Sequence, residues 1–230
     1  PCELISEIEL KKITSLTSNR DGVVVVEMPE NNFFENRSKF SLVLDGINDP
    51  GNLGTIIRIA DWYGISEIIA SPDTVDIYNS KTLMATMGSF TRVRVIYVDL
   101  EQFLTEQKGK KIYAECGGFM YLAKKIHLLD GANYDFCGIF DLEIKMRKNL
   151  NIKRFGYINI ETGNEIKLKG HEFHYSEIGE NKENFTFYKI FKNDDRKWNC
   201  GYRKKSALAG YPHISFFSNL EFFKFLVEEL

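Results

Sequence analysis

The feature that most constrains the fold is an alternation of short apolar runs with helical patterns through the first half of the chain. Apolar runs typical of strands cover residues 22–29, 41–47, 67–71, 92–99 and 110–115. Helical patterns separate or follow them at residues 52–63, 79–88, 100–109 and 117–126. Strands that alternate with helices pair in parallel, because each helix carries the chain back to the end of the sheet where the next strand starts. The first half therefore predicts an α/β fold.

The second half changes character after residue 138, where strand-like segments follow one another until a helical pattern over residues 219–230. No linker-like segment lies near residue 110, and a junction inside a strand is not where independently folded domains are joined. We therefore predict one three-layer α/β domain with a mostly parallel, flavodoxin- or Rossmann-like sheet and a β-rich C-terminal extension. Segments 1–110 and 111–230 would complete this domain together.

Charge and composition narrow the range of partners. Thirty basic and 32 acidic side chains leave a formal charge of −2, so any contact with RNA has to be local. No apolar run reaches 18 residues, and the N-terminal segment has no apolar signal core. The four cysteines, at positions 2, 116, 137 and 200, form no CxxC pair that would indicate a zinc site or a disulfide framework. We expect a cytoplasmic protein with no membrane partner and no metal.

The densest motif of the first half is "LDGINDPGNLGTIIRIADWYG" at residues 44–64. A strand, a polar loop and a helix start near Asn52 present backbone N–H groups at the carboxyl edge of a parallel sheet, where ligands bind. Arg58 follows on the helix and could position a phosphate or a hydroxyl. The alternative is a solvated arginine on an amphipathic helix.

This motif resembles the first motif of the SpoU/TrmH family of RNA ribose 2'-O-methyltransferases, and the similarity runs from about residue 4 to 110. The resemblance implies that Asn52 is the motif's asparagine, in a substrate-binding role, and that Arg58 is its catalytic arginine. The family's S-adenosylmethionine site depends on later motifs, which do not occur after residue 110. We therefore expect no cofactor and no methyl transfer.

The stretch "YAECGGFMYL" places Cys116 between a strand and a helix. Gly117 and Gly118 permit a tight turn that exposes the cysteine, and the start of the helix would stabilise a thiolate. Most cysteines in apolar surroundings are instead inert, which is our interpretation of Cys137 and Cys200.

Together with "KGHEFHYS" (169–176) and "AGYPHISFF" (209–217), this stretch resembles the glutamine amidotransferase domain of cobyrinic acid a,c-diamide synthases, a class I family that uses a catalytic triad. The resemblance covers about residues 110–230 and implies that Cys116 is the nucleophile, that His213 is its base and that glutamine is the substrate, with Gly117 and Gly118 at the binding site. Ser215 stands where many class I enzymes carry the glutamate of the triad.

Two histidines of the second motif are also candidates for a site. His171 and His174 are three residues apart, so a regular strand would point them to opposite faces, which argues against a pair of metal ligands. We therefore interpret this segment as a structural strand.

Two families in one chain lead us to expect an engineered or recombined chimera without complete parental activity. The glycine-rich loop that supplies an oxyanion donor in the amidotransferase family has no counterpart between residues 92 and 111. Two alternatives remain open. One is a weak glutaminase through Cys116 and His213, and the other is a module that binds RNA weakly through Asn52 and Arg58. Sheet edges exposed by the exchange would favour a homodimer.

Overall fold

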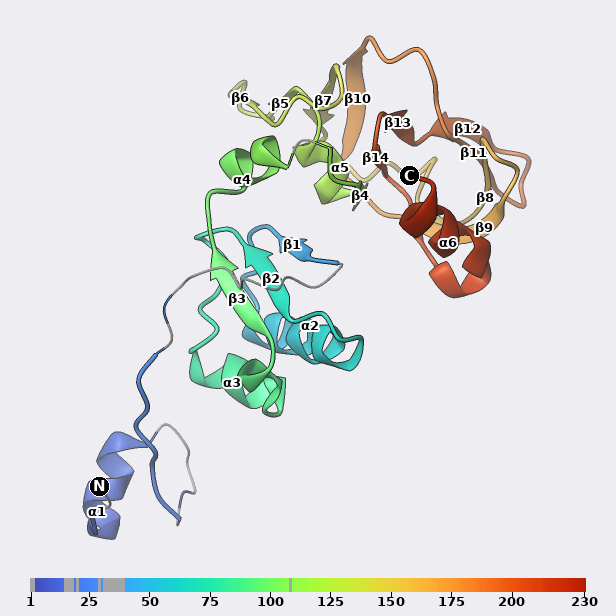
Figure 1. Cartoon of the computed structure of the whole chain (residues 1–230). Coiled ribbons are helices and arrows are strands. Elements are labelled where there is room, and N and C mark those ends of the chain that lie inside the picture. The colour runs from blue at the N-terminus through green and yellow to red at the C-terminus, as the bar shows by residue number, and fades with distance from the viewer. Residues whose placement is uncertain (1–2, 15–18, 20, 29, 31–39, 108) are drawn as a thin grey trace. The chain divides into compact units, whose positions relative to one another are not determined.

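The computed structural model describes residues 3–14, 19, 21–28, 30, 40–107 and 109–230. The chain forms two compact units, Pro1–Leu100 and Glu101–Leu230. The elements of both are labelled in Figure 1. Within the described residues, no helix is long and apolar enough to cross a membrane.

The first unit is built on a parallel sheet of three strands in the order β1-β2-β3. Its elements are α1 (Glu7–Ile13), β1 (Leu42–Leu44), α2 (Pro50–Trp62), β2 (Glu67–Ala70), α3 (Ser80–Thr86), η1 (Ser89–Thr91) and β3 (Arg94–Tyr97) (Figure 1). Leu53 and Ile57 of α2 pack with Ile68 of β2 and with Val93 in a fully buried core. The alternation of strands and helices predicted for this region is confirmed from residue 41 to residue 99.

Local chemistry explains where α2 begins and how closely it packs. The Asp49 carboxylate accepts a hydrogen bond from the Asn52 backbone N–H at 2.7 Å, and Pro50 occupies the first turn, where no backbone donor is needed. One turn later, a Cβ at Gly54 would lie 2.4 Å from the Ala85 Cβ. Glycine at position 54 therefore allows α2 and α3 to approach each other.

The strand predicted over residues 22–29 is wrong for the part of that run that the structure describes. Residues 22–28 have no regular secondary structure, and the side chains of Val24, Val25 and Val26 are 86%, 92% and 74% exposed. A strand needs a neighbour for its backbone hydrogen bonds, and the described ladder of this unit contains only β1, β2 and β3. Residue 29 lies outside the described residues.

The second unit holds three sheets. The first has the order β13-β14-β4, with β14 parallel to β4. The other two have the orders β10-β7-β5-β6 and β12-β11-β8-β9-β15. Its strands are β4 (Ile112–Glu115), β5 (Lys125–His127), β6 (Asn133–Asp135), β7 (Leu142–Met146), β8 (Gly156–Thr162), β9 (Lys167–Glu172), β10 (Ser176–Asn181), β11 (Tyr188–Phe191), β12 (Lys197–Cys200), β13 (Tyr202–Lys204), β14 (Ala207–Gly210) and β15 (His213–Ile214).

Helices of this unit are few and short, and much of its core is aromatic. They are α4 (Leu100–Glu106), which begins at the last residue of the first unit, α5 (Gly117–Tyr121), η2 (Phe216–Ser218) and α6 (Leu220–Glu228). Phe222 and Phe225 of α6 are buried with Phe119, Tyr188 and Tyr211 in one cluster. The amphipathic C-terminal helix and the β-rich extension were both predicted.

The mixed α/β class is confirmed, but the strands of the two segments do not join in one sheet within the described residues. β3 is an edge strand of the first unit's sheet, and β4 is an edge strand beside β14. Parallel pairs are confined to β1-β2-β3, β14-β4 and β5-β7, and the other pairs are antiparallel. Each unit has a hydrophobic core of its own.

The helix predicted over residues 117–126 is too long. α5 ends at Tyr121, and Lys125–His127 forms β5, which pairs with β6 and β7. Tertiary pairing of this strand outweighs the local helical pattern.

Candidate active site

Cys116 lies at a sharp turn between β4 and α5. Its backbone has φ 49° and ψ −105°, a region that is unfavourable for a residue with a side chain. A hydrogen bond to the sheet stabilises this conformation, because the Cys116 N–H donates to the Gly210 carbonyl of the neighbouring strand at 2.9 Å. The elbow that the sequence predicts is therefore present.

The two glycines after Cys116 differ in how much space they leave for a side chain. A Cβ at Gly118 would lie 3.2 Å from the Ala114 Cβ, closer than ordinary van der Waals contact, whereas a Cβ at Gly117 would meet nothing within 4 Å. Gly118 thus permits the tight return of the chain against β4.

His213 meets Cys116 because β4 and β14 are parallel neighbours. Both strands end at the same edge, and the chain leaves β14 at Gly210 and reaches His213 after two residues. The His213 side chain is hydrogen-bonded to the Cys116 thiol and to Glu115, and these two bonds, in that order, raise the pKa of His213 to about 10. The imidazole is therefore protonated at neutral pH, beside the sulfur.

Glu115 is a site residue that the sequence interpretation missed. Its Oε2 lies 3.5 Å from the His213 Nδ1. Its Oε1 accepts hydrogen bonds from the Tyr113 hydroxyl at 2.6 Å and from the Ile214 backbone N–H at 2.9 Å. Adjacent residues of a regular strand point to opposite faces, so the sequence does not predict that Glu115 and Cys116 both lie near His213. The positive φ at Cys116 changes the direction of the chain and allows it. Glu115 thus takes the orienting position next to His213, while Ser215 lies beyond β15 as an exposed residue.

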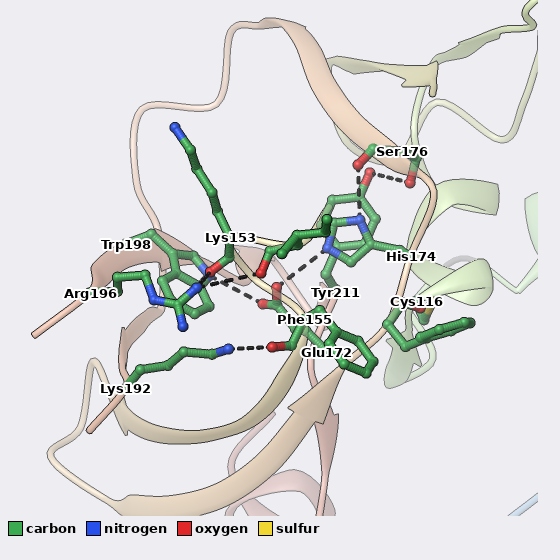
Figure 2. A network of polar contacts seen from close by, with 12 residues as sticks. Cys116, Lys153, Phe155, Glu172, His174, Ser176, Lys192, Arg196, Trp198 and Tyr211 are labelled. Atoms are coloured by element: carbon green, nitrogen blue, oxygen red, sulfur yellow. Dashed lines mark hydrogen bonds and ion pairs between the residues drawn. The ribbon is translucent and has the colours of Figure 1, made fainter. Parts of the chain in front are cut away.

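A third segment faces the nucleophile. The Cys116 Sγ lies 3.6 Å from the carbonyl oxygen of Phe173, toward which the thiol is directed. Figure 2 shows Cys116 together with a polar network that includes Glu172, His174 and Ser176.

His171 and His174 lie in different surroundings. His171, on β9, is opposite His213 in the ladder, whereas His174 follows the end of the strand and is only 4% exposed. Among the described residues, no group of three or more histidine, cysteine or acidic side chains is arranged to hold a metal ion.

The other two described cysteines differ from Cys116. Burial raises the pKa of Cys200 to about 12 and that of Cys137 to about 11. Both thiols are therefore protonated at neutral pH, as expected for cysteines that do no chemistry.

Asn52 and Arg58 belong to the first unit, on α2. Both are exposed, and Asn52 supplies its backbone N–H to the Asp49 cap. These two residues lie six positions apart on one helix of the first unit, whereas Cys116, Glu115 and His213 belong to the second unit.

A cysteine at a strand-to-helix elbow, close to a histidine that follows the neighbouring parallel strand in the chain, is an arrangement typical of enzymes that attack carbonyl groups through sulfur. The family model for the CobB/CobQ-like glutamine amidotransferase domain matches residues 94–221. This match covers more than half of the 230 residues, and the chain belongs to that family. The model of the SpoU rRNA methylase family matches residues 39–127, so both resemblances seen in the sequence are confirmed.

Individual relatives divide in the same way. Cobyrinate a,c-diamide synthase of Fusobacterium nucleatum is 44% identical over 117 residues, which are 50% of this chain and 26% of the relative. The 23S rRNA (guanosine(2553)-2'-O)-methyltransferase RlmP of Bacillus subtilis is 33% identical over 114 residues, which are 49% of this chain and 45% of the relative. A crystal structure of a glutamine amidotransferase matches 82% of this chain and 97% of its own, at 11% identity and a TM-score of 0.45. The chain thus spans less than half the length of either curated relative.

Proposed function

We propose that the second unit hydrolyses the side-chain amide of glutamine through Cys116, as a weak glutaminase. The observation that carries the proposal is the grouping of Cys116, His213 and Glu115 at a strained elbow, with the Glu115 Oε2 3.5 Å from the His213 Nδ1. Membership of the amidotransferase family supports glutamine as the substrate.

The protonated His213 stabilises the thiolate of Cys116, which attacks the amide carbon of glutamine and forms a tetrahedral intermediate. As this intermediate collapses, the carbon–nitrogen bond breaks and His213 gives its proton to the leaving nitrogen, which departs as ammonia. The neutral His213 then takes a proton from water, which attacks the thioester. The carbon–sulfur bond then breaks, the new carboxyl group loses its proton to ammonia or solvent as glutamate leaves, and the Cys116 thiolate again lies beside the protonated His213. Glu115 keeps the imidazole oriented through both steps.

The rate should be low for a reason that is visible in the sequence. The second oxyanion donor expected in this family lies in a glycine-rich loop before the cysteine strand, and residues 92–111 contain no such loop. Loss of one such donor typically lowers turnover by about 100- to 1000-fold. The proposal therefore does not require the activity of a complete amidotransferase.

Ammonia release from glutamine tests this proposal. Wild-type protein should release ammonia slowly, Cys116→Ala should abolish the release, and His213→Ala should lower it by about 100-fold or more, since general acid–base groups contribute about 10²–10⁴-fold. Cys137→Ala, which removes a thiol that burial keeps protonated, should leave the rate unchanged. Equal rates in wild type and Cys116→Ala would disprove the proposal.

We also propose that the chain arose by recombination, natural or engineered, between genes of the two families. The two family models overlap at residues 94–127, and each curated relative matches about half of the chain. Sequencing one unbroken DNA molecule across the codons for this overlap tests the proposal. Two separate reading frames in the source DNA would contradict it.

A further inference from the structure

A buried polar cluster lies in the segments next to Cys116 and His213, and the proposed chemistry does not use it. Its members are Glu172, His174, Ser176 and Tyr211, whose exposed fractions are 0%, 4%, 0% and 0%. We call these four residues the clamp. Figure 2 shows all four together with Cys116.

A buried contact between a histidine and a carboxyl group forms one part of the clamp. The His174 Nε2 lies 3.3 Å from the Glu172 Oε2, and the His174 Nδ1 lies 2.9 Å from the Ser176 carbonyl oxygen. Both ring nitrogens of His174 therefore have a polar partner. Trp198 Nε1 donates to the other Glu172 oxygen at 3.2 Å, so both carboxylate oxygens have partners.

The His174 ring connects this pair to the segment that carries the base. It stacks on the Tyr211 ring with centroids 3.8 Å apart and planes inclined by 9°. Tyr211 comes two residues before His213, and Phe173, whose carbonyl faces the Cys116 sulfur, comes immediately before His174. The His174 ring therefore stacks on a residue close to His213 and directly follows Phe173, which contacts Cys116.

Ser176 makes the second connection. Its hydroxyl lies 2.9 Å from the Tyr211 hydroxyl and 3.3 Å from the Met120 sulfur. Met120 is on α5, four residues after Cys116. The Ser176 hydroxyl therefore joins the helix that starts at the nucleophile to the segment that ends at the base.

We propose that Ser176 and Tyr211, held in place by the Glu172–His174 pair, are positioning residues that set the distance between Cys116 and His213. The inference rests on the proposed function, because it assigns a role toward that same pair. Reacting groups tolerate little displacement, and a shift of about 1 Å can lower a rate by about 100-fold.

A purely structural role is the alternative, since buried polar groups need partners in any core. Variants of Glu172 or His174 cannot separate the two roles, because each would leave a buried polar group without its partner and threaten folding. Tyr211→Phe and Ser176→Ala are better suited, since each removes the same hydroxyl-to-hydroxyl hydrogen bond and little volume.

The test compares these two variants and their double mutant with Tyr202→Phe. The control removes the hydroxyl of another buried tyrosine of the same core, which accepts a hydrogen bond from Asn181. Each single clamp variant should lower kcat for glutamine hydrolysis by about 10-fold with KM nearly unchanged, as expected for a small displacement of reacting groups. The double mutant should be no worse than Ser176→Ala, because the bond that Tyr211→Phe removes is already lost in that variant.

A second measurement keeps the inference separate from the glutaminase proposal. The rate of Cys116 alkylation by iodoacetamide is measured with and without His213→Ala, in wild type and in each clamp variant. In wild type the histidine should accelerate alkylation, and in the clamp variants this acceleration should fall by about 10-fold by the same reasoning. The double mutant should again match Ser176→Ala.

The outcomes are distinct. Clamp variants that fold, match Tyr202→Phe in kcat and retain the full acceleration by His213 would overturn the positioning role. A wild type that releases no ammonia, but in which the clamp variants still weaken the acceleration by His213, would overturn the glutaminase proposal and leave the positioning role standing.

Discussion

At the scale of single residues, the chemistry depends on where Glu115 points. It lies beside Cys116 in the chain, yet the elbow at Cys116 lets it reach His213. The sequence showed a cysteine followed by glycines and a later histidine, and both are in the site. The acidic partner was sought two residues after His213, where Ser215 stands. Strand alternation, which is sound for regular β structure, could not anticipate a positive φ at the residue after the glutamate.

The Glu115–His213 pair predicts a dependence of stability on pH. The pKa of His213 is raised from 6.5 to about 10 in the folded protein. A raised histidine pKa stabilises the fold fully below the unfolded value and ceases to do so as pH rises through the folded value. The free energy of unfolding of the second unit should therefore fall between about pH 6.5 and pH 10.

Glu115→Gln should reduce this fall, because Glu115 is, after Cys116, the second group that raises the pKa of His213, and a neutral amide favours the protonated imidazole less than a carboxylate does. Urea unfolding across this pH range, with an NMR titration of His213, measures both effects. Glu183→Gln, which breaks an ion pair with Lys204, is the matched control. An identical pH dependence in wild type and Glu115→Gln would show that Glu115 does not hold the charge of His213.

At the scale of elements, close packing constrains the first unit. α2 and α3 approach each other at Gly54, where a Cβ would also lie 2.9 Å from the Ala85 backbone carbon. Backbone atoms cannot rotate away as the end of a long side chain can. The Gly54 position therefore controls how the two helices pack.

Gly54→Ala should destabilise the first unit by about 1–3 kcal/mol, the usual cost of overpacking. Helix propensity alone predicts the opposite, since alanine in a helix is favoured over glycine by about 1 kcal/mol. Thr55→Ala, at an exposed position of the same helix, serves as the control and should be close to neutral. Urea unfolding followed by circular dichroism measures the change, and a stabilised Gly54→Ala would contradict the packing described here.

The elements themselves differ in how well the sequence predicts them. α2, β2, α3 and β3 follow clear periodic patterns, are bounded by recognisable caps or turns, and occur where predicted. The helix predicted over 117–126 fails because Lys125–His127 pairs with strands distant in the chain. The run at 22–28 fails because β propensity forms no strand without a partner. Both errors concern contacts that a local pattern cannot encode.

At the scale of the whole molecule, the chain combines parts of two families. The predicted α/β class holds, but the single sheet does not, because each segment carries enough apolar side chains to close a core of its own. The described contacts among Cys116, Glu115 and His213 all lie within the second unit.

The central claim is that Cys116 and His213 act as a coupled pair, and the most direct test is the rate of Cys116 alkylation by iodoacetamide across pH, with mass spectrometry to locate the label. At pH 7 wild type should react at least about 10-fold faster than His213→Ala, because a nearby imidazolium favours the reactive thiolate. The difference should vanish as pH rises through about 10, where His213 loses its proton. Equal rates in the two proteins at every pH would contradict the account.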